Sequence, residues 1–139
     1  MLRDPSLVPL SHEHQHALAL CVLIDRSTAD VDIQARTIVD QFDSEMRSHF
    51  EVEERVLFPA AAAIPAAHDL VQELIAEHRR MTSMVDVLRR TGDRGIIAEF
   101  TDVLRRHVRK EENSLFEEVQ RSLSREQLDR LGVLICEKD

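Results

Sequence analysis

The chain of 139 residues contains no tryptophan and no tyrosine, and only three glycines and four prolines. Without these two aromatic residues it lacks an evident platform on which bases or sugars could stack. The scarcity of glycine and proline argues against a fold with many strand turns, because such turns use these residues. What remains is 43% apolar and 32% charged, rich in Ala, Leu, Glu and Arg, and this composition favours an all-α fold.

The chain also lacks a positive charge excess, a disulfide framework and a long apolar run. Its formal net charge of −8 argues against binding nucleic acid, which requires a basic surface. The two cysteines, Cys21 and Cys136, lie far apart, as is usual for a reduced intracellular protein. The longest apolar run, residues 17–24, is too short to cross a bilayer, and no secretion signal precedes it. We therefore expect a cytoplasmic protein with no membrane partner.

Apolar residues recur every three or four positions, the period of an α-helix, in five segments of the chain. Pro59 is expected to end the second segment, and Ser124 with Gln127 forms a capping-box pattern before the fifth. Short connections between the four long helices predict an all-α, up-down-up-down four-helix bundle with a short extra C-terminal helix. One domain, 1–139, is expected, with a core of about 10–121. The predicted helices span about 10–26, 31–58, 68–90, 95–121 and 125–136.

The second and fourth predicted helices carry a repeated pattern. Residues 42–58, "FDSEMRSHFEVEERVLF", match residues 100–116, "FTDVLRRHVRKEENSLF", in their Phe, Arg, His, Glu and Leu positions. The first and third helices also resemble each other, since each contains a Glu-His pair, Glu13-His14 and Glu77-His78. The chain therefore consists of two helix pairs of one design.

The repeated histidines and glutamates lie on the apolar faces of their helices. At 100° per residue, Glu53 lies only about 40° from His49, in the middle of the apolar stripe of its helix. His107 and Glu111 share a stripe in the same way, and His78 lies among apolar residues of the third helix. The glutamates that follow in sequence, at 54 and 112, fall outside these stripes. We therefore predict that two carboxylates and several imidazoles point into the core.

The first helix begins with "SHEHQHALAL", which allows two interpretations. His12, Glu13 and His16 match the H-E-x-x-H motif of zinc metallopeptidases, with the glutamate as general base. His14 instead shares a stripe with apolar residues and matches His78 in the repeat, which makes it the better inward candidate. His12 and His16 would then lie about 160° and 200° from His14, on average toward the surface.

Burying two carboxylates and four imidazoles costs several kcal/mol unless something pairs them. A shared cation is an economical partner, and bundle cores are where such sites are built. These donors are too many for one tetrahedral zinc ion. They suit two ions bridged by both carboxylates, with two imidazoles on each ion. Imidazole with carboxylate suits iron, although affinity alone does not exclude zinc, copper or manganese.

Four segments in order, "LSHEHQHAL", "HFEVEERVLFP", "EHRRM" and "HVRKEENSLFE", resemble the hemerythrin-like (HHE cation-binding) family. The resemblance covers about residues 10–120 and implies a non-haem di-iron centre, with two Fe ions, that meets O2, nitric oxide or peroxide. One departure is Leu74, which stands where oxygen-carrying members have a fifth histidine. The metal ligands that the resemblance implies are His14, His49, Glu53, His78, His107 and Glu111.

The leading hypothesis is a di-iron protein that binds or senses O2, nitric oxide or peroxide. Leu74 would leave an open position on one iron, which disfavours reversible oxygen carriage unless His12, His16 or Glu77 replaces the missing ligand. A di-iron enzyme that decomposes peroxide or supports iron-sulfur repair is the alternative, and no catalytic residue is identified. The zinc peptidase is a remote third. The redox partner and the oligomeric state do not follow from the sequence.

Overall fold

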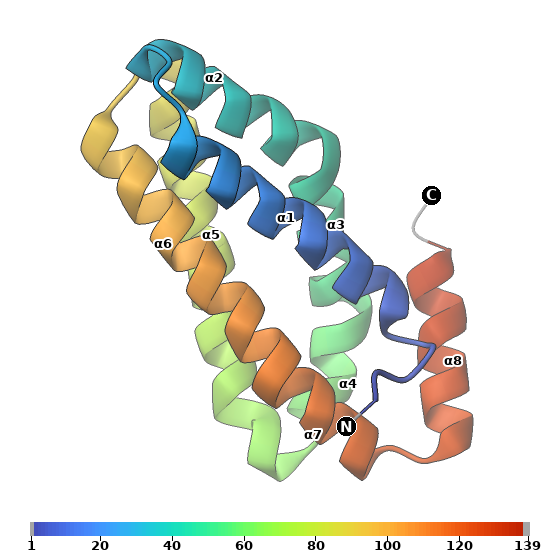
Figure 1. Ribbon diagram of the computed structural model, residues 1–139. Coiled ribbons are helices and arrows are strands. Elements are labelled where there is room, and N and C mark those ends of the chain that lie inside the picture. Colours follow the sequence, from blue (N-terminus) through green and yellow to red (C-terminus); the bar gives the residue numbers. More distant parts are fainter. Residues whose placement is uncertain (1, 138–139) are drawn as a thin grey trace.

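The computed structural model describes residues 2–137, which form five helical rods. The first rod is α1 (Val8–Arg26) and the third is α5 (His68–Arg90), after a short 3-10 turn at Pro65–Ala67. Two other rods are interrupted by π-helical segments, and a fifth, α8 (Arg125–Cys136), follows the bundle. Four rods form the bundle and α8 lies against one side of it (Figure 1). The prediction of an all-α bundle is confirmed, and the described residues contain no strand.

The second rod runs through α2 (Val31–Gln41), α3 (Arg47–Val52) and α4 (Phe58–Ala62). Five-residue π-helical segments, η1 (Phe42–Met46) and η2 (Glu53–Leu57), join these pieces. The fourth rod runs through α6 (Arg94–Lys110), a π-helical segment η4 (Glu111–Leu115) and α7 (Phe116–Ser122). The segments η2 and η4 begin at Glu53 and Glu111, the two carboxylates that the helical pattern directed inward. Single π-turns within α-helices occur often at functional sites.

The prediction that Pro59 ends the second helix is wrong. Its rod continues to Ala62, and Pro59 lies in the first turn of α4. The reason is local: η2 replaces the regular α-helical hydrogen bonds just before Pro59, with the Phe58 N–H donating to the Glu53 carbonyl. Proline is tolerated in the first turn of a helix, where its missing N–H matters least.

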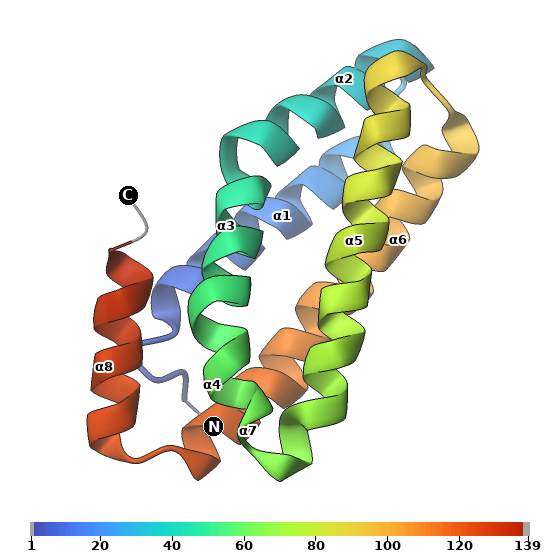
Figure 2. The ribbon, with the colours of Figure 1, turned by 180° about the vertical axis from the view of Figure 1, so that it is seen from behind.

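The connections between rods bring the two halves of the chain together. The α1–α2 and α5–α6 loops lie at the same end of the bundle (Figure 2). There the Gly92 N–H donates to Asp32 Oδ1 over 3.1 Å. A side chain at residue 92 would begin 2.4 Å from that oxygen, so the close approach of the loops requires glycine.

The core consists of two apolar clusters, one toward each end of the bundle. The cluster nearer the α1–α2 loop includes Ile38, Phe42 and Met81, and the other includes Leu57, Leu74 and Phe116. Along each rod the inward histidines and glutamates occur where one cluster gives way to the other. A polar layer is therefore enclosed between two apolar layers, in a position from which water is largely excluded.

The C-terminal helix α8 covers the second of these clusters. Its capping box is present, with Ser124 Oγ accepting from the Gln127 N–H and the Gln127 side chain accepting from the Ser124 N–H. Leu128, Leu131 and Ile135 are buried, whereas Leu134 is 41% exposed. No helix in residues 2–137 combines the length and apolar character needed to cross a membrane.

Candidate metal centre

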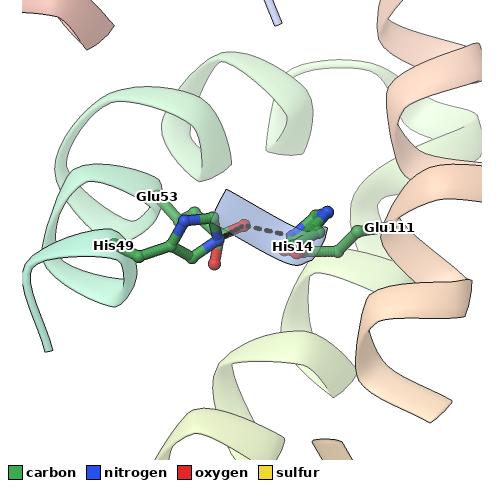
Figure 3. A group of neighbouring side chains, drawn as sticks. All are labelled: His14, His49, Glu53 and Glu111. Carbon is green, nitrogen blue, oxygen red and sulfur yellow. Dashed lines mark hydrogen bonds and ion pairs between the residues drawn. The ribbon is translucent and has the colours of Figure 1, made fainter. Parts of the chain in front are cut away.

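The six predicted ligands come together in the polar layer, and all six are buried. α1 contributes His14, and α5 contributes His78. The two interrupted rods each contribute a histidine and a glutamate one turn apart. Figure 3 shows His14 and Glu111 meeting His49 and Glu53 from different rods. The helical stripes directed all six side chains into the core, and the structure places them there. Their binding of metal stays a prediction.

The donor atoms of the six residues fall into two groups of four, each with all its donors within 4.8 Å of one another. One group contains His14 and His49, the other contains His78 and His107, and both contain Glu53 and Glu111. Glu53 is typical: its Oε2 lies 3.2 Å from His49 Nε2, and its Oε1 lies 3.0 Å from His78 Nε2. Glu111 similarly lies 2.8 Å from His14 Nε2 and 3.6 Å from His107 Nε2. Each carboxylate thus faces both histidine pairs.

Three buried atoms in this layer lack a hydrogen-bond partner: His49 Nε2, Glu53 Oε2 and Glu111 Oε2. His49 Nε2 and Glu53 Oε2 approach each other, but not in the geometry of a hydrogen bond. An unsatisfied buried polar atom costs about 1–3 kcal/mol. All three belong to the two groups of buried donors, and their lone pairs are what a cation requires. The donor set therefore fits a bound metal.

The electrostatics of the cluster favour the same interpretation. Burial and the neighbouring Glu53 carboxylate raise the pKa of Glu111. Burial lowers the pKa of His14, but its hydrogen bonds to Glu111 and Glu112 outweigh that effect and raise the pKa to about 9. Two carboxylates this close repel each other, so protons held between imidazoles and carboxylates stabilise the cluster when no cation is bound. A cation would displace these protons.

Each of the four buried histidines also contacts a second carboxylate through its other ring nitrogen. The Nδ1 atoms of His49 and His107 lie 2.7 and 2.8 Å from Glu13 and Glu77. Those of His78 and His14 lie 2.7 and 2.5 Å from Glu54 and Glu112. An ionised carboxylate only accepts, so Nδ1–H donates in each case and Nε2 is left to face the centre.

These four outer contacts form a closed ring around the bundle. Each rod supplies a glutamate to the histidine of the next, and the fourth supplies Glu112 to His14 on the first. The sequence analysis missed this ring, because the helical wheel places residues 54 and 112 outside the apolar stripes. The available signal was their adjacency to Glu53 and Glu111 and the recurrence of all four glutamates in the repeat.

Further contacts hold the outer glutamates in place. Ser11 Oγ donates to Glu112 Oε2 over 2.8 Å, and Arg3 donates to Glu112 Oε1 over 3.2 Å. Lys110 donates to the second oxygen of Glu77. Phenylalanine rings support the histidines: Phe50 stacks on His78 with ring centroids 3.8 Å apart, and Phe116 stacks on His14 at 5.5 Å. The orientation of the imidazoles is therefore set by packing as well as by hydrogen bonds.

The ambiguous "HEHQH" segment is divided between the core and the surface. His14 is 4% exposed and lies in the core, whereas His12 and His16 are exposed. Glu13 turns toward His49 rather than toward its neighbours in the motif. Of the three residues in the H-E-x-x-H pattern, the two histidines therefore lie at the surface and the glutamate contacts a buried histidine.

None of the residues considered as a replacement for the fifth histidine takes its place. Leu74 is fully buried within the second apolar cluster. Glu77 is engaged with His107 and Lys110, and His12 and His16 lie outside the core. A pocket of about 320 Å³ instead reaches His14, His49 and His107 from the surface between α1 and the η1–α3 segment. Small molecules thus have a route to the polar layer.

Cys21 lies on α1, about two turns after His14. Burial raises the pKa of its thiol to about 11. Its Sγ lies 3.7 Å from the Thr101 carbonyl, to which it donates. A neutral, buried thiol is a poor nucleophile and a poor metal ligand. Cys21 therefore serves as a small buried residue of the core.

An all-α bundle whose core holds paired His/Glu groups defines the class of metal-binding helical bundles. Residues 8–119 match the sequence model of the hemerythrin HHE cation binding domain. The chain belongs to this family, and all six buried donors lie within the matched range. No curated protein and no solved structure gives a significant match to the chain.

Proposed function

We propose that the chain is a non-haem di-iron protein that binds or senses O2, nitric oxide or peroxide. The observation that carries this proposal is the division of six buried donors into two groups that share both carboxylates. Two shared carboxylates and two imidazoles per group suit a pair of bridged first-row ions. Family membership favours iron for these ions. When bound, two iron ions would supply a redox-active centre with affinity for small oxygen- and nitrogen-containing ligands.

The protein residues would supply position, protection and access. The outer glutamates hold the imidazoles with Nε2 inward, and the two apolar clusters separate the centre from bulk water. The pocket lined by His14, His49 and His107 would admit a small ligand from the surface. Leu74, in the position of the fifth histidine, donates nothing to a metal, so we propose redox chemistry or sensing rather than reversible oxygen carriage.

An enzyme that decomposes peroxide is the second candidate, and the pocket favours it to the same degree, because a substrate also needs access. Among the residues that line the pocket, Glu13 and Glu45 carry carboxylates, and Glu13 is bound to His49. The pocket has an apolar wall of Met46, Phe50, Leu104 and Val108. We therefore assign no catalytic acid or base.

Metal analysis of protein produced in iron-replete medium tests the proposal. We expect two iron ions per chain and near-ultraviolet absorption typical of a bridged diferric pair. His14→Ala should lower the metal content, whereas His68→Ala, which removes an exposed histidine outside the centre, should leave it unchanged. One tightly held zinc ion per chain, with iron excluded in competition, would contradict the proposal. Oxygen binding that reverses on removal of oxygen would contradict the proposed role of Leu74.

A further inference from the structure

The two surface histidines of the "HEHQH" segment remain unexplained by the buried centre. His12 and His16 are one helical turn apart on α1, and their ring centroids are 4.9 Å from each other. His16 Nδ1 lies 3.3 Å from Glu45 Oε1, which belongs to η1 on the neighbouring rod. Two imidazoles and one carboxylate from two helices thus gather at one place on the surface.

A hydrogen bond from a side chain of the second rod to the backbone of the first helps to hold these two rods in register. The Gln41 side chain, from the last residue of α2, donates through Nε2 to the His16 carbonyl over 3.1 Å. This bond fixes η1, which begins at the next residue, against the middle of α1. The Gln41 bond therefore helps to hold His16 and Glu45 opposite each other, in addition to the attraction between their own side chains.

The location of this group distinguishes it from an ordinary solvated pair of charges. His12, His16 and Glu45 all line the pocket that reaches the buried centre. Glu13 lines the same pocket and contacts His49, whose Nε2 faces the centre. Among these lining residues, the side chains of His16 and Glu45 are exposed, that of Glu13 is 26% exposed, and those of His14 and His49 are buried. Every one of these side chains is a type that binds divalent cations.

We propose that His12, His16 and Glu45 form a third metal site, at the mouth of the pocket, which captures the divalent ions that then enter the buried centre. The three side chains have room to move, because all three are exposed. Within residues 2–137, the donor atoms of the two buried groups already converge, whereas those of the three surface side chains do not. Rotation between staggered rotamers would bring the three surface donors onto one ion at little cost.

The donor set defines the class of ion. Two histidines and one carboxylate with open positions suit Fe²⁺ and also Zn²⁺ or Co²⁺. Water would complete the coordination, so the site should bind more weakly than the buried centre and release its ion more readily. A weaker outer site is what capture before transfer requires. This role in supply rests on the proposed function of the buried centre, whereas the existence of the third site does not.

Titration with Co²⁺ tests whether the third site exists. The full chain, loaded with iron, is titrated with Co²⁺ and the bound ion is measured by calorimetry and visible absorption. We expect one additional equivalent per chain, lost in the His12→Ala, His16→Ala double variant and weakened in Glu45→Gln. The controls are His68→Ala and Glu51→Gln, which remove an exposed histidine and an exposed glutamate elsewhere. Absence of the extra equivalent, or its persistence in the double variant, would overturn the site.

Uptake kinetics test the supply role. Metal-free protein is mixed with Fe²⁺ under anaerobic conditions, and occupancy is followed over time by metal analysis of quenched, desalted samples. The double variant should reach the same final occupancy as the wild type but more slowly, while His68→Ala fills at the wild-type rate. Equal rates would overturn the supply role. If wild type never fills its centre with iron, the proposed function fails, while the Co²⁺ titration of the unfilled protein still decides the third site through its loss in the double variant.

Discussion

At the scale of single residues, the most informative feature is the contact of each buried histidine with an outer glutamate. Glu112 Oε2 lies 2.5 Å from His14 Nδ1, and the Glu112 side chain is 25% exposed. Glu54 Oε2 lies 2.7 Å from His78 Nδ1, but the Glu54 side chain is 48% exposed. Hydrogen bonds shielded from water are stronger. The two glutamates, equivalent in the repeat, should therefore support their histidines unequally.

We predict that Glu112→Gln lowers metal affinity by about 10–100-fold, and that Glu54→Gln lowers it less. An amide in place of the carboxylate holds the imidazole less firmly and makes its Nε2 less basic. Competition with a chromogenic chelator measures the affinity, and Glu51→Gln, on the exposed side of the same rod as Glu54, is the control. Wild-type affinity in Glu112→Gln would show that the Nδ1 contact does not support the centre.

From the sequence alone, Glu54 and Glu112 fell outside the inward stripes and had no assigned part in the centre. The helical wheel correctly separated the pairs, since Glu53 and Glu111 are fully buried and their neighbours are not. It failed for the neighbours because it records the direction of a side chain at its Cβ and ignores its reach. A glutamate on the flank of a stripe can extend around to a histidine on the next helix.

At the scale of helices, periodicity predicted where the rods lie but not how they are built. The ranges predicted for the third and fifth helices coincide with α5 and α8, because polar breaks and a capping box delimit them. The π-helical segments were not predicted. Apolar spacing of three or four residues does not distinguish a single wide turn from the α-helix around it. The same wide turn explains why Pro59 does not end its rod.

The docking of α8 offers a prediction that depends on pH. Arg125 Nη1 and Nη2 donate to the Asp4 carboxylate over 2.6 and 2.9 Å, which ties α8 to the segment before α1. Arg125 holds the pKa of Asp4 well below its usual range, and bonds from Ser6 act in the same direction. A carboxyl whose pKa is lowered on folding stabilises the fold above its unfolded pKa of about 3.9, and this stabilisation is lost as the pH falls through the folded value.

Asp4→Asn should therefore reduce the free energy of unfolding by roughly 1 kcal/mol at pH 7. The difference from wild type should shrink as the pH falls below about 4, because the carboxyl of the unfolded wild-type chain is protonated first, and it should vanish as the pH falls through the lower folded pKa of Asp4. Urea denaturation followed by circular dichroism at several pH values measures both effects. Asp102→Asn, which breaks an exposed pair with Arg106 within one helix, is the control and should change stability less. A difference that does not vary with pH would contradict the assignment to this ion pair.

At the scale of the whole molecule, the metal centre and the fold depend on each other. The polar layer lies between two apolar clusters, and three of its buried atoms lack hydrogen-bond partners. An ion that binds only the folded chain stabilises it by mass action. The apolar clusters do not require the ion, so they should preserve the helices when it is removed.

We predict that a chelator lowers the melting temperature of the metal-loaded protein while its far-ultraviolet circular dichroism at 25 °C stays helical. An ion present at about 100 times its dissociation constant would contribute about 2.7 kcal/mol. Thermal denaturation with and without chelator measures the shift. His14→Ala, which removes a predicted ligand, should respond much less. Equal melting temperatures for metal-loaded and chelated wild type would show that the buried donors do not bind a metal.

The ring of outer glutamates has a consequence for how the molecule could be divided. The contact of Glu13 with His49 lies within the first half of the chain, and that of Glu77 with His107 lies within the second. The other two contacts cross between the halves, one in each direction. Each half of the chain, a single helical hairpin, therefore contains one complete contact and supplies one histidine and one glutamate to the two contacts that cross. Two identical hairpins placed back to back would close the same ring, so the smallest design unit for this centre is half as long as the protein that contains it.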